Sequence, residues 1–261
     1  MNRFATLLAL VILAPARAQD VQTVIDCMRA NVPPALRVQE IELAATDRTG
    51  ATRSLKGKLY AMLEKTAAGG GLVRAMLRMN APESIAGTSY LVREVAGSQS
   101  EDMFVYLPSF RRARRITSSL DDRSLLGTDF SYSDFKLLSN AFVGSSAKLE
   151  QSGVVVQRPT YTVLFKPLPG SASRYNTIRA WVDEETCVPL KADFYVGDAV
   201  RKRLTAPASA LKQAGKFWYL SQVVMRDLLE NTKTVMTTDT VTGGPELPGS
   251  YFDPNLFYLS N

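Results

Sequence analysis

The residues that decide the fold read KGKLYAML at positions 56–63 and, after a run of glycines, LVRAMLRM at positions 72–79. In the first segment, one face carries Leu59, Ala61 and Leu63. In the second segment, one face carries Val73, Ala75, Leu77 and Met79, and the other carries Leu72, Arg74, Met76 and Arg78. A period of two places successive side chains on opposite faces of an extended strand. Each segment is therefore predicted to be a β-strand.

The same period recurs along most of the chain. Further strands are predicted at Val38–Ala45, Thr88–Val95, Ser100–Leu107, Arg112–Thr117, Ala147–Gln151, Tyr161–Lys166, Asn176–Asp183, Pro189–Tyr195, Val200–Ala206, Phe217–Arg226 and Thr232–Thr242. About a dozen short strands with short polar connections predict an antiparallel meander and not βαβ units. Such a meander closes or curls to hide its edges. We therefore expect a mainly β fold in one large curved sheet or barrel.

One segment, Gly127–Phe142, interrupts the alternation. It contains Ser131-Tyr132-Ser133-Asp134, which fits a capping box because the Asp134 side chain can reach back to the Ser131 amide. An apolar stripe typical of a short helix follows at Tyr132, Phe135, Leu138 and Phe142. This helix is either a plug over an open barrel end or a lid that lines an apolar cavity, and the periodicity alone favours the plug.

Two more helices are predicted, one toward each end of the chain. Asp20–Ala30 has apolar residues at helical spacing, and Pro33-Pro34 ends the helix. Asp253–Leu259 is a second candidate, because Pro254 suits the first helical turn.

The N-terminal residues have the pattern of a secretory signal peptide. Asn2 and Arg3 precede an apolar run from Phe4 to Ala14, and Ala16-Arg17-Ala18 supplies the small residues of a cleavage site. The run is shorter than the about 20 residues that a membrane-spanning helix needs. The alternative is an N-terminal core helix. We expect residues 1–18 to be removed and residues 19–261 to form a single domain in an oxidising compartment outside the cytoplasm.

The composition excludes several catalytic classes. The chain has 261 residues with no His and two Cys, and 31 Lys and Arg against 25 Asp and Glu. Without imidazole, Ser-His-Asp and Cys-His hydrolases, HExxH metalloproteases and most zinc enzymes are excluded. Two cysteines cannot make a four-thiolate zinc or iron–sulfur site. We expect no metal, no cofactor and no catalytic residue.

The two cysteines, Cys27 and Cys187, are predicted to form a disulfide, because disulfides persist outside the cytoplasm. Closing so long a loop stabilises by up to about 4–5 kcal/mol in the chain-entropy model. The alternative is two separate buried thiols.

The densest charge cluster lies between Ser109 and Ile116 and contains Arg111, Arg112, Arg114 and Arg115. In an extended strand these arginines point to both faces. The run is either a solvated strand edge protected against pairing or a site for phosphate or carboxylate head groups or an acidic partner. Nucleic acid is not expected because of the signal peptide. Carboxylates that could pair with the arginines are Asp121, Asp122 and Asp129.

Two blocks of the sequence carry a resemblance to a known family. The first contains FVYLP at 104–108, RRARRI at 111–116 and GTDFSYSDF at 127–135. It resembles the signature YLP…RRvRRI…(M/L)G(S/T)DFSYxD(F/L) of LolA-like outer-membrane lipoprotein-sorting proteins. The second block, WVD at 181–183 with Thr186 and PLK at 189–191, looks like a strand–turn–strand of that family. In order and length, the similarity spans most of residues 20–261.

The resemblance implies a half-open antiparallel β-barrel with short helices covering its mouth. It implies a non-enzymatic carrier that binds acyl chains of lipoproteins or lipids in an apolar cavity. The carrier would ferry them through the periplasm of a Gram-negative cell toward the outer membrane, with transient membrane contact. Some members of the family are associated with inner-membrane exporters of the RND type, so a lipid is an alternative cargo.

The candidate site residues follow from this expectation. The acyl cavity or its lid is expected to involve Met62, Met76, Tyr132, Phe135, Leu138 and Phe142. Head groups or a partner would be contacted by Arg111, Arg112, Arg114 and Arg115. A second hypothesis is a periplasmic sensor or accessory domain that binds a membrane partner such as an RND-type exporter. A third is a secreted enzyme, although no nucleophile elbow, dyad spacing or cofactor loop is visible.

Overall fold

The computed structural model describes residues 20–65, 71–95, 101–116, 124–139, 141–142, 144–169, 173–244 and 246–260. The predicted signal peptide at residues 1–18 lies outside these ranges, and so do Asp121 and Asp122.

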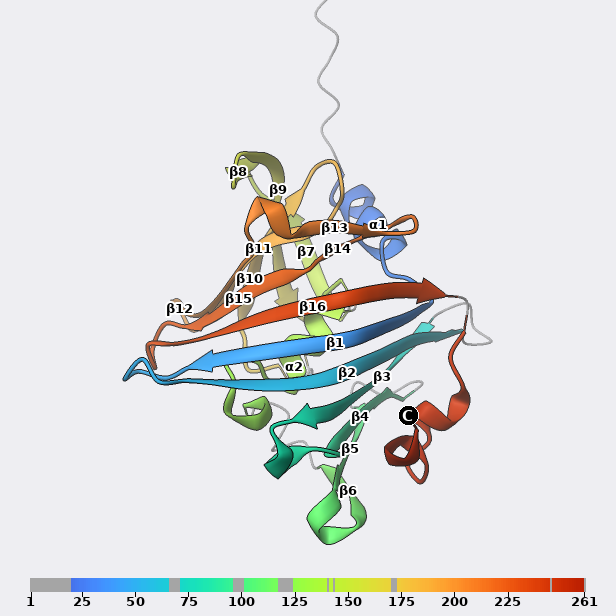
Figure 1. Cartoon of the computed structure of the whole chain (residues 1–261). Coiled ribbons are helices and arrows are strands. Elements are labelled where there is room, and N and C mark those ends of the chain that lie inside the picture. The colour runs from blue at the N-terminus through green and yellow to red at the C-terminus, as the bar shows by residue number, and fades with distance from the viewer. Residues whose placement is uncertain are drawn as a thin grey trace, which may run out of the picture.

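One antiparallel sheet of 14 strands dominates the structure (Figure 1). Its strands, in spatial order, are β6 (Arg112–Ile116), β5 (Glu101–Leu107), β4 (Ser89–Glu94), β3 (Gly71–Ala81), β2 (Thr52–Lys65), β1 (Ala35–Thr46), β16 (Thr232–Gly244), β15 (Gln222–Asp227), β12 (Ala199–Thr205), β11 (Pro189–Val196), β10 (Thr177–Asp183), β9 (Arg158–Pro167) and β7 (Ser145–Leu149). A short strand, β8 (Gly153–Val155), pairs with β9 outside this order. A separate hairpin is formed by β13 (Leu211–Ala214) and β14 (Phe217–Leu220).

Helices are few and short. The α-helices are α1 (Val21–Ala30) and α2 (Tyr132–Ser139). The 3-10 turns are η1 (Glu83–Ile85), η2 (Pro108–Phe110), η4 (Leu125–Gly127), η5 (Ala208–Ala210), η6 (Gly249–Phe252) and η7 (Phe257–Leu259). Both α-helices lie where the apolar spacing predicted them.

The large sheet consists of two meanders that meet in its middle. Strands β1 to β6 follow one another in chain order on one side, and strands β7 to β12 with β15 and β16 make up the other side. The two sides join where β1 pairs with β16, from Ala35 opposite Gly244 to Thr46 opposite Lys233. Strands β6 and β7 stand at opposite ends of the strand order, so the sheet curls without closing. The predicted half-open antiparallel barrel is confirmed.

The alternating pattern that predicted β2 and β3 sorts their side chains between two cores. Leu77 and Met79 are buried in the main hydrophobic core on the inner face of the sheet. Met76 lies on the outer face of the same strand, and so does Tyr60 of the neighbouring β2. Each face of these two strands therefore packs against a different apolar core.

The outer core is completed by the C-terminal segment, residues 246–260. The buried members of this core are Ala35, Tyr60, Met76, Leu91, Leu247, Phe252 and Phe257. The ring of Tyr258 stacks on Tyr106 of β5, with centroids 4.1 Å apart. Arg78 of β3 donates a hydrogen bond to the carbonyl oxygen of Ser260 at 2.5 Å. Side chains thus hold this segment on the sheet, outside any strand pairing.

Two parts of the predicted element pattern are wrong. In place of the helix predicted at Asp253–Leu259 there is a turn at residues 254–256 followed by the single 3-10 turn η7. The Leu259 amide donates to the Leu256 carbonyl, three residues back, so the α-helical pattern does not continue. The strand predicted at Phe217–Arg226 is divided between β14 and β15 at Ser221. The Ser221 amide and hydroxyl both donate to the Ala210 carbonyl, which turns the chain away from the hairpin. Strands β8 and β13 were not predicted.

Candidate functional site

An apolar cavity of about 280 Å³ lies at one end of strands β1, β2 and β16. Its walls come from these strands, from α1, from the β13–β14 hairpin and from the C-terminal part of α2 and the residues after it. Representative lining residues are Met28, Leu36, Met62, Leu138, Trp218 and Val223. Among the described residues that line the cavity, none is charged. The cavity is therefore suited to a hydrocarbon group and not to a polar one.

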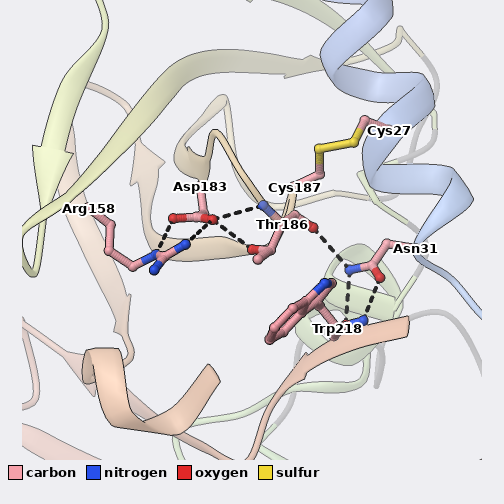
Figure 2. Close-up of a disulfide and its surroundings, with 7 residues drawn as sticks. All are labelled: Cys27, Asn31, Arg158, Asp183, Thr186, Cys187 and Trp218. Atoms are coloured by element: carbon pink, nitrogen blue, oxygen red, sulfur yellow. Dashed lines mark hydrogen bonds and ion pairs between the residues drawn. A yellow bond between two sulfur atoms is a disulfide. The ribbon is translucent and has the colours of Figure 1, made fainter. Parts of the chain in front are cut away.

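Helix α1 is held against the cavity by two attachments, one covalent and one through hydrogen bonds (Figure 2). The predicted disulfide between Cys27 and Cys187 is present, with Cα atoms 5.8 Å apart. One turn further on, the Asn31 side chain accepts a hydrogen bond from the Trp218 amide at 2.6 Å and donates one to the Trp218 carbonyl at 2.9 Å. The first attachment joins α1 to the turn between β10 and β11, and the second joins it to β14. Together they make α1 and the hairpin one continuous wall.

The turn that carries Cys187 is itself supported by a buried carboxylate. Asp183 accepts hydrogen bonds from the Thr186 amide at 2.9 Å, from the Thr186 hydroxyl at 2.8 Å and from the Arg158 guanidinium at 2.9 Å. Burial alone would raise the pKa of Asp183, but the hydrogen bonds from Arg158 and Thr186 outweigh it, so the pKa lies below its ordinary value. The pKa of Arg158 is raised above its ordinary value, mainly by its hydrogen bond to Asp183 and next by its hydrogen bond to Glu185. The ion pair of Arg158 with Asp183 keeps the turn in place beneath the disulfide.

Helix α2 begins with the capping box that the sequence predicted. The Ser131 amide donates to the Asp134 carboxylate at 2.8 Å, and the Asp134 amide donates to the Ser131 hydroxyl at 3.2 Å. These reciprocal bonds satisfy amides that have no partner within the helix. They fix where α2 starts inside the curved sheet.

The capping carboxylate of Asp134 also joins α2 to the sheet. It receives a hydrogen bond from the Tyr175 hydroxyl at 2.7 Å and lies 2.7 Å from the Lys202 ammonium on β12. The side chain of Asp134 is fully buried, and that of Lys202 is 6% exposed. An ion pair this deep costs desolvation energy that its partners must offset. The N-terminal end of α2 is therefore held at one place by charge.

The preceding residues of the GTDFSYSDF motif attach the same loop to β16 and β2. Asp129 accepts a hydrogen bond from the Thr234 hydroxyl at 2.6 Å and another from Thr232. Gly127 has a left-handed backbone with φ of +70°, and an added Cβ atom would lie 2.2 Å from the Arg53 guanidinium. The pairing of Asp129 with the arginines at 111–115 that the sequence suggested is thus wrong, because threonine hydroxyls take its carboxylate oxygens.

The predicted acyl-site residues separate into different environments. Leu138 and Met62 line the cavity. Phe142 is buried in the main core, where its ring stacks on Phe165 with centroids 4.6 Å apart. Phe135 packs partly buried against the same core, beside Phe130. Helix α2 and its continuation therefore act as a plug at Phe142 and as a cavity wall at Leu138.

One predicted acyl-site residue, Met76, lies across the sheet from the cavity. Met76 is on the outer face of the sheet under the C-terminal segment, because it has the opposite strand parity to Val73, which does line the cavity. Its predicted place in the cavity is corrected accordingly. Tyr132 begins α2, and its side chain lies outside the described part of the structure.

The four arginines between 111 and 115 lie at and beyond the last strand of the sheet. None of them lines the apolar cavity. Arg112, Arg114 and Arg115 are exposed on β6, and Arg111 precedes it in a left-handed conformation. Arg115 forms an ion pair with Asp102, and Arg114 lies over the ring of Phe110. Contact between these side chains and the head group of a ligand in the cavity is therefore not supported.

Sequence reasoning missed a polar pocket and the hairpin wall. A pocket of about 510 Å³ at the opposite end of β1, β2 and β16 is lined by Arg53, Asp129, Lys202 and Asp227, among others. The only sequence pattern that could indicate this pocket is charged residues at the ends of strands. Ordinary solvated turns have the same pattern, so it does not identify a pocket. The hairpin wall is visible in the sequence only as the aromatic run Phe217-Trp218-Tyr219, which reads as part of a longer strand.

Two features are absent from the described ranges. No group of three or more Cys, Asp or Glu side chains there could hold a metal ion. No described helix has the length and apolar character needed to cross a bilayer.

Comparisons with known proteins identify the fold. At TM-score 0.80, the chain is similar to a DUF1329 family protein from Desulfovibrio piger, with 23% identity over 89% of this chain and 97% of that one. At TM-score 0.79, it is similar to an outer membrane lipoprotein-sorting protein domain from Vibrio parahaemolyticus, with 19% identity over 90% and 97%. At TM-score 0.70, it is similar to a LolA superfamily protein from Nitrosomonas europaea, with 16% identity over 90% and 98%. No curated protein matches the chain significantly.

A protein-family model matches residues 71–257, and its description reads "Uncharacterized protein". The match spans well over half of the chain and includes the RRARRI and GTDFSYSDF segments. The chain therefore belongs to the family that this model describes, and its fold is that of the LolA-like outer-membrane lipoprotein-sorting proteins.

Proposed function

We propose that the protein is a periplasmic carrier that binds acyl chains of lipoproteins or lipids and ferries them toward the outer membrane. Residues 19–261 act as one lipid-binding domain after removal of residues 1–18. The observation that carries the proposal is the uncharged cavity enclosed by α1, the β13–β14 hairpin and Leu138. The role is binding and release, without a chemical step.

The free energy of acyl transfer makes such a cavity useful. Each methylene group removed from water contributes about 0.8 kcal/mol, so a 16-carbon chain contributes roughly 12 kcal/mol. A chain in water cannot meet that cost, so a carrier must shield it. The cavity has a volume of about 280 Å³, just below the range of about 300–1,000 Å³ typical of sites for small organic molecules. A long acyl chain therefore needs one wall to move outward.

The movable wall is α2 and not α1. Helix α1 is attached by the disulfide of Cys27 and by both polar atoms of the Asn31 side chain. Helix α2 is attached at its N-terminal end by Asp134, whereas Leu138 near its C-terminal end contributes only apolar contacts to the cavity. Tilting about the Asp134 end enlarges the cavity at Leu138, and the ring of Phe142 in the main core limits how far the helix moves.

The adaptable residues of the cavity support a carrier more than a rigid receptor. Met28, Met62 and Met236 line it, and unbranched methionine side chains fill irregular volumes without a fixed shape. A carrier has to accept chains of varying form and also release them. Affinity from a deformable wall satisfies both needs.

The proposal is tested by analysing what the protein carries. The mature protein, purified from its native compartment, is examined by native mass spectrometry for bound lipid. It is then delipidated and titrated with a fatty acid, a phospholipid and an acylated peptide. Uptake that is reduced in Leu138→Trp but not in Leu168→Trp supports the cavity, because Leu168 is exposed elsewhere. If the delipidated protein takes up none of the three ligands, the carrier function is rejected.

The sensor or accessory role is separated by a transfer assay. Donor vesicles with a fluorescent phospholipid are mixed with unlabelled acceptor vesicles, with and without the protein. A carrier accelerates transfer in proportion to its concentration. Ligand uptake without any acceleration, together with a stable complex with an inner-membrane protein, favours a sensor or accessory domain instead.

A further inference from the structure

The turn between β5 and β6 forms a projecting element, here called the basic tip and defined as residues 108–115. It consists of η2, then Arg111 with φ of +47°, then the first residues of β6. Strand β6 is an edge strand of the sheet, and its connection to β5 projects at the bottom of Figure 1. The basic tip is therefore free to approach a large object that the rest of the sheet does not contact.

An aromatic side chain is exposed in the middle of the basic tip. The side chain of Phe110 is 60% exposed, whereas the other described phenylalanines are buried or partly buried. The guanidinium carbon of Arg114 lies 5.1 Å from the centroid of its ring. The basic tip thus presents an apolar ring and a cation side by side. Covering an apolar ring that is exposed in this way is favourable, because it removes apolar surface from water.

The charge of the basic tip is strongly positive. Its four arginines are all exposed: Arg111, Arg112, Arg114 and Arg115. Within the described residues, the ion pair of Arg115 with Asp102 is the single carboxylate contact made by the four. Guanidinium groups donate bidentately to phosphate oxygens. The chemistry fits a surface rich in phosphate.

We propose that the basic tip docks the protein on the surface of an anionic lipid bilayer. The ring of Phe110 enters the interface, and the arginines contact lipid phosphates. Basic residues near such a surface each add to the attraction, and an inserted apolar side chain adds to it independently. The proposal gives the carrier function its membrane-contacting element, and it rests on that function only in that a carrier must visit a membrane.

A bilayer fits the basic tip better than an acidic protein does. A stable protein interface needs about 800 Å² on each partner with close shape complementarity. The basic tip is a projecting turn with one exposed ring, and its residues line neither the apolar cavity nor the polar pocket. A fluid layer of head groups adapts to a convex shape, whereas a protein surface needs a matching hollow.

The test is co-sedimentation of the mature protein with vesicles of two compositions, phosphatidylcholine alone and phosphatidylcholine with phosphatidylglycerol. Wild type is expected to bind the second kind and to be released by salt. Arg112→Gln/Arg114→Gln is expected to weaken binding about tenfold or more, because each cation contributes about 1 kcal/mol at an anionic surface. Phe110→Ser is expected to weaken binding several-fold at every salt concentration.

Matched controls come from two other turns of the sheet, β1–β2 and β15–β16. Arg48→Gln/Arg226→Gln removes two exposed arginines outside the basic tip, and Leu229→Ser removes a side chain that is 73% exposed at another turn. Both controls are expected to bind as wild type does. An equal loss of binding in the controls overturns the proposal, and so does wild-type binding that is equal on both vesicle compositions.

Two further arms keep the outcomes distinct. If soluble poly-glutamate binds as tightly as the anionic vesicles and Phe110→Ser does not change vesicle binding, the basic tip is a site for acidic protein and the bilayer proposal fails. Fatty-acid uptake by the basic-tip variants is measured separately and is expected to equal that of wild type. If wild type takes up no fatty acid but still binds anionic vesicles, the carrier function is rejected and the docking proposal is retained.

Discussion

The ammonium of Lys202 lies 2.7 Å from the carboxylate of Asp134, and both side chains are almost completely enclosed by protein. Asp134 is at the same time the capping residue of α2 and a hydrogen-bond acceptor for Tyr175. One carboxylate therefore decides where the helix begins and where it attaches to β12. Removing either member of the ion pair leaves the other as a buried, unpaired charge.

We predict that Lys202→Met destabilises the protein by about 3–5 kcal/mol, because it leaves Asp134 charged without its partner. The double variant Asp134→Asn/Lys202→Met should be less destabilised than the sum of the two single variants. Urea unfolding followed by circular dichroism measures this coupling. Lys148→Met, at an exposed position, is the control and should change stability by less than about 0.5 kcal/mol. Additive effects of the two single changes would contradict the role of the pair.

Leu138 and Phe142 should respond differently to substitution, although both belong to the predicted apolar stripe. Phe142→Ala removes a fully buried ring from the main core and should cost about 3–5 kcal/mol of stability. Leu138→Asn should cost less stability but weaken fatty-acid binding at least tenfold, because it puts an amide into the uncharged cavity. Fluorescent fatty-acid displacement and thermal unfolding measure the two effects. If both changes weakened fatty-acid binding equally, the assignment of Leu138 to the cavity wall and of Phe142 to the core would be contradicted.

Reduction of the disulfide should loosen α1 from the turn at Cys187. The two cysteines are 160 residues apart in the sequence, and removing such a cross-link costs about 2–5 kcal/mol. Cys27→Ser/Cys187→Ser should melt at a lower temperature than wild type and be insensitive to dithiothreitol. Wild type in dithiothreitol should approach the melting temperature of the variant. An unchanged melting temperature on reduction would mean that Asn31 holds α1 alone.

Acid should weaken the turn that Asp183 supports. The pKa of this carboxyl is lower in the folded protein than its ordinary value, so its contribution to stability is complete above the unfolded pKa of about 4. The contribution is lost as the pH falls through the lower, folded pKa. Asp183→Asn should therefore be less stable than wild type by about 1–3 kcal/mol at pH 7. Measured by urea unfolding, this difference should shrink below about pH 4, and a constant difference would contradict the mechanism.

The local part of the fold was accessible from the sequence because it depends on neighbouring residues. Alternation over 72–79 predicts both the strand and the two faces of β3, and the capping box at Ser131 and Asp134 predicts the start of α2. The failure at Asp253–Leu259 has a tertiary origin. Packing of Phe257 against the outer face of the sheet determines the backbone there, and helical spacing does not.

The site was accessible only in part. The sequence placed Leu138 and Met62 at an apolar cavity, but it could not separate them from Met76, which lies across the sheet. Partners from distant parts of the chain were not predictable either. Nothing near Asp134 in the sequence points to Lys202, and nothing near Asn31 points to Trp218. These pairings arise when strands far apart in sequence become neighbours in space.

The pairing of β1 with β16 has a consequence for how the molecule is made. A ribosome or an export channel delivers the chain in order, so the β1 partner in the middle of the finished sheet arrives almost last. Each meander can assemble from nearby residues, but joining the two requires closure of a loop of nearly the whole domain, which slows folding. Until then β1 presents an open hydrogen-bonding edge. Escort by a chaperone is therefore most valuable during this interval, before the last strand is released.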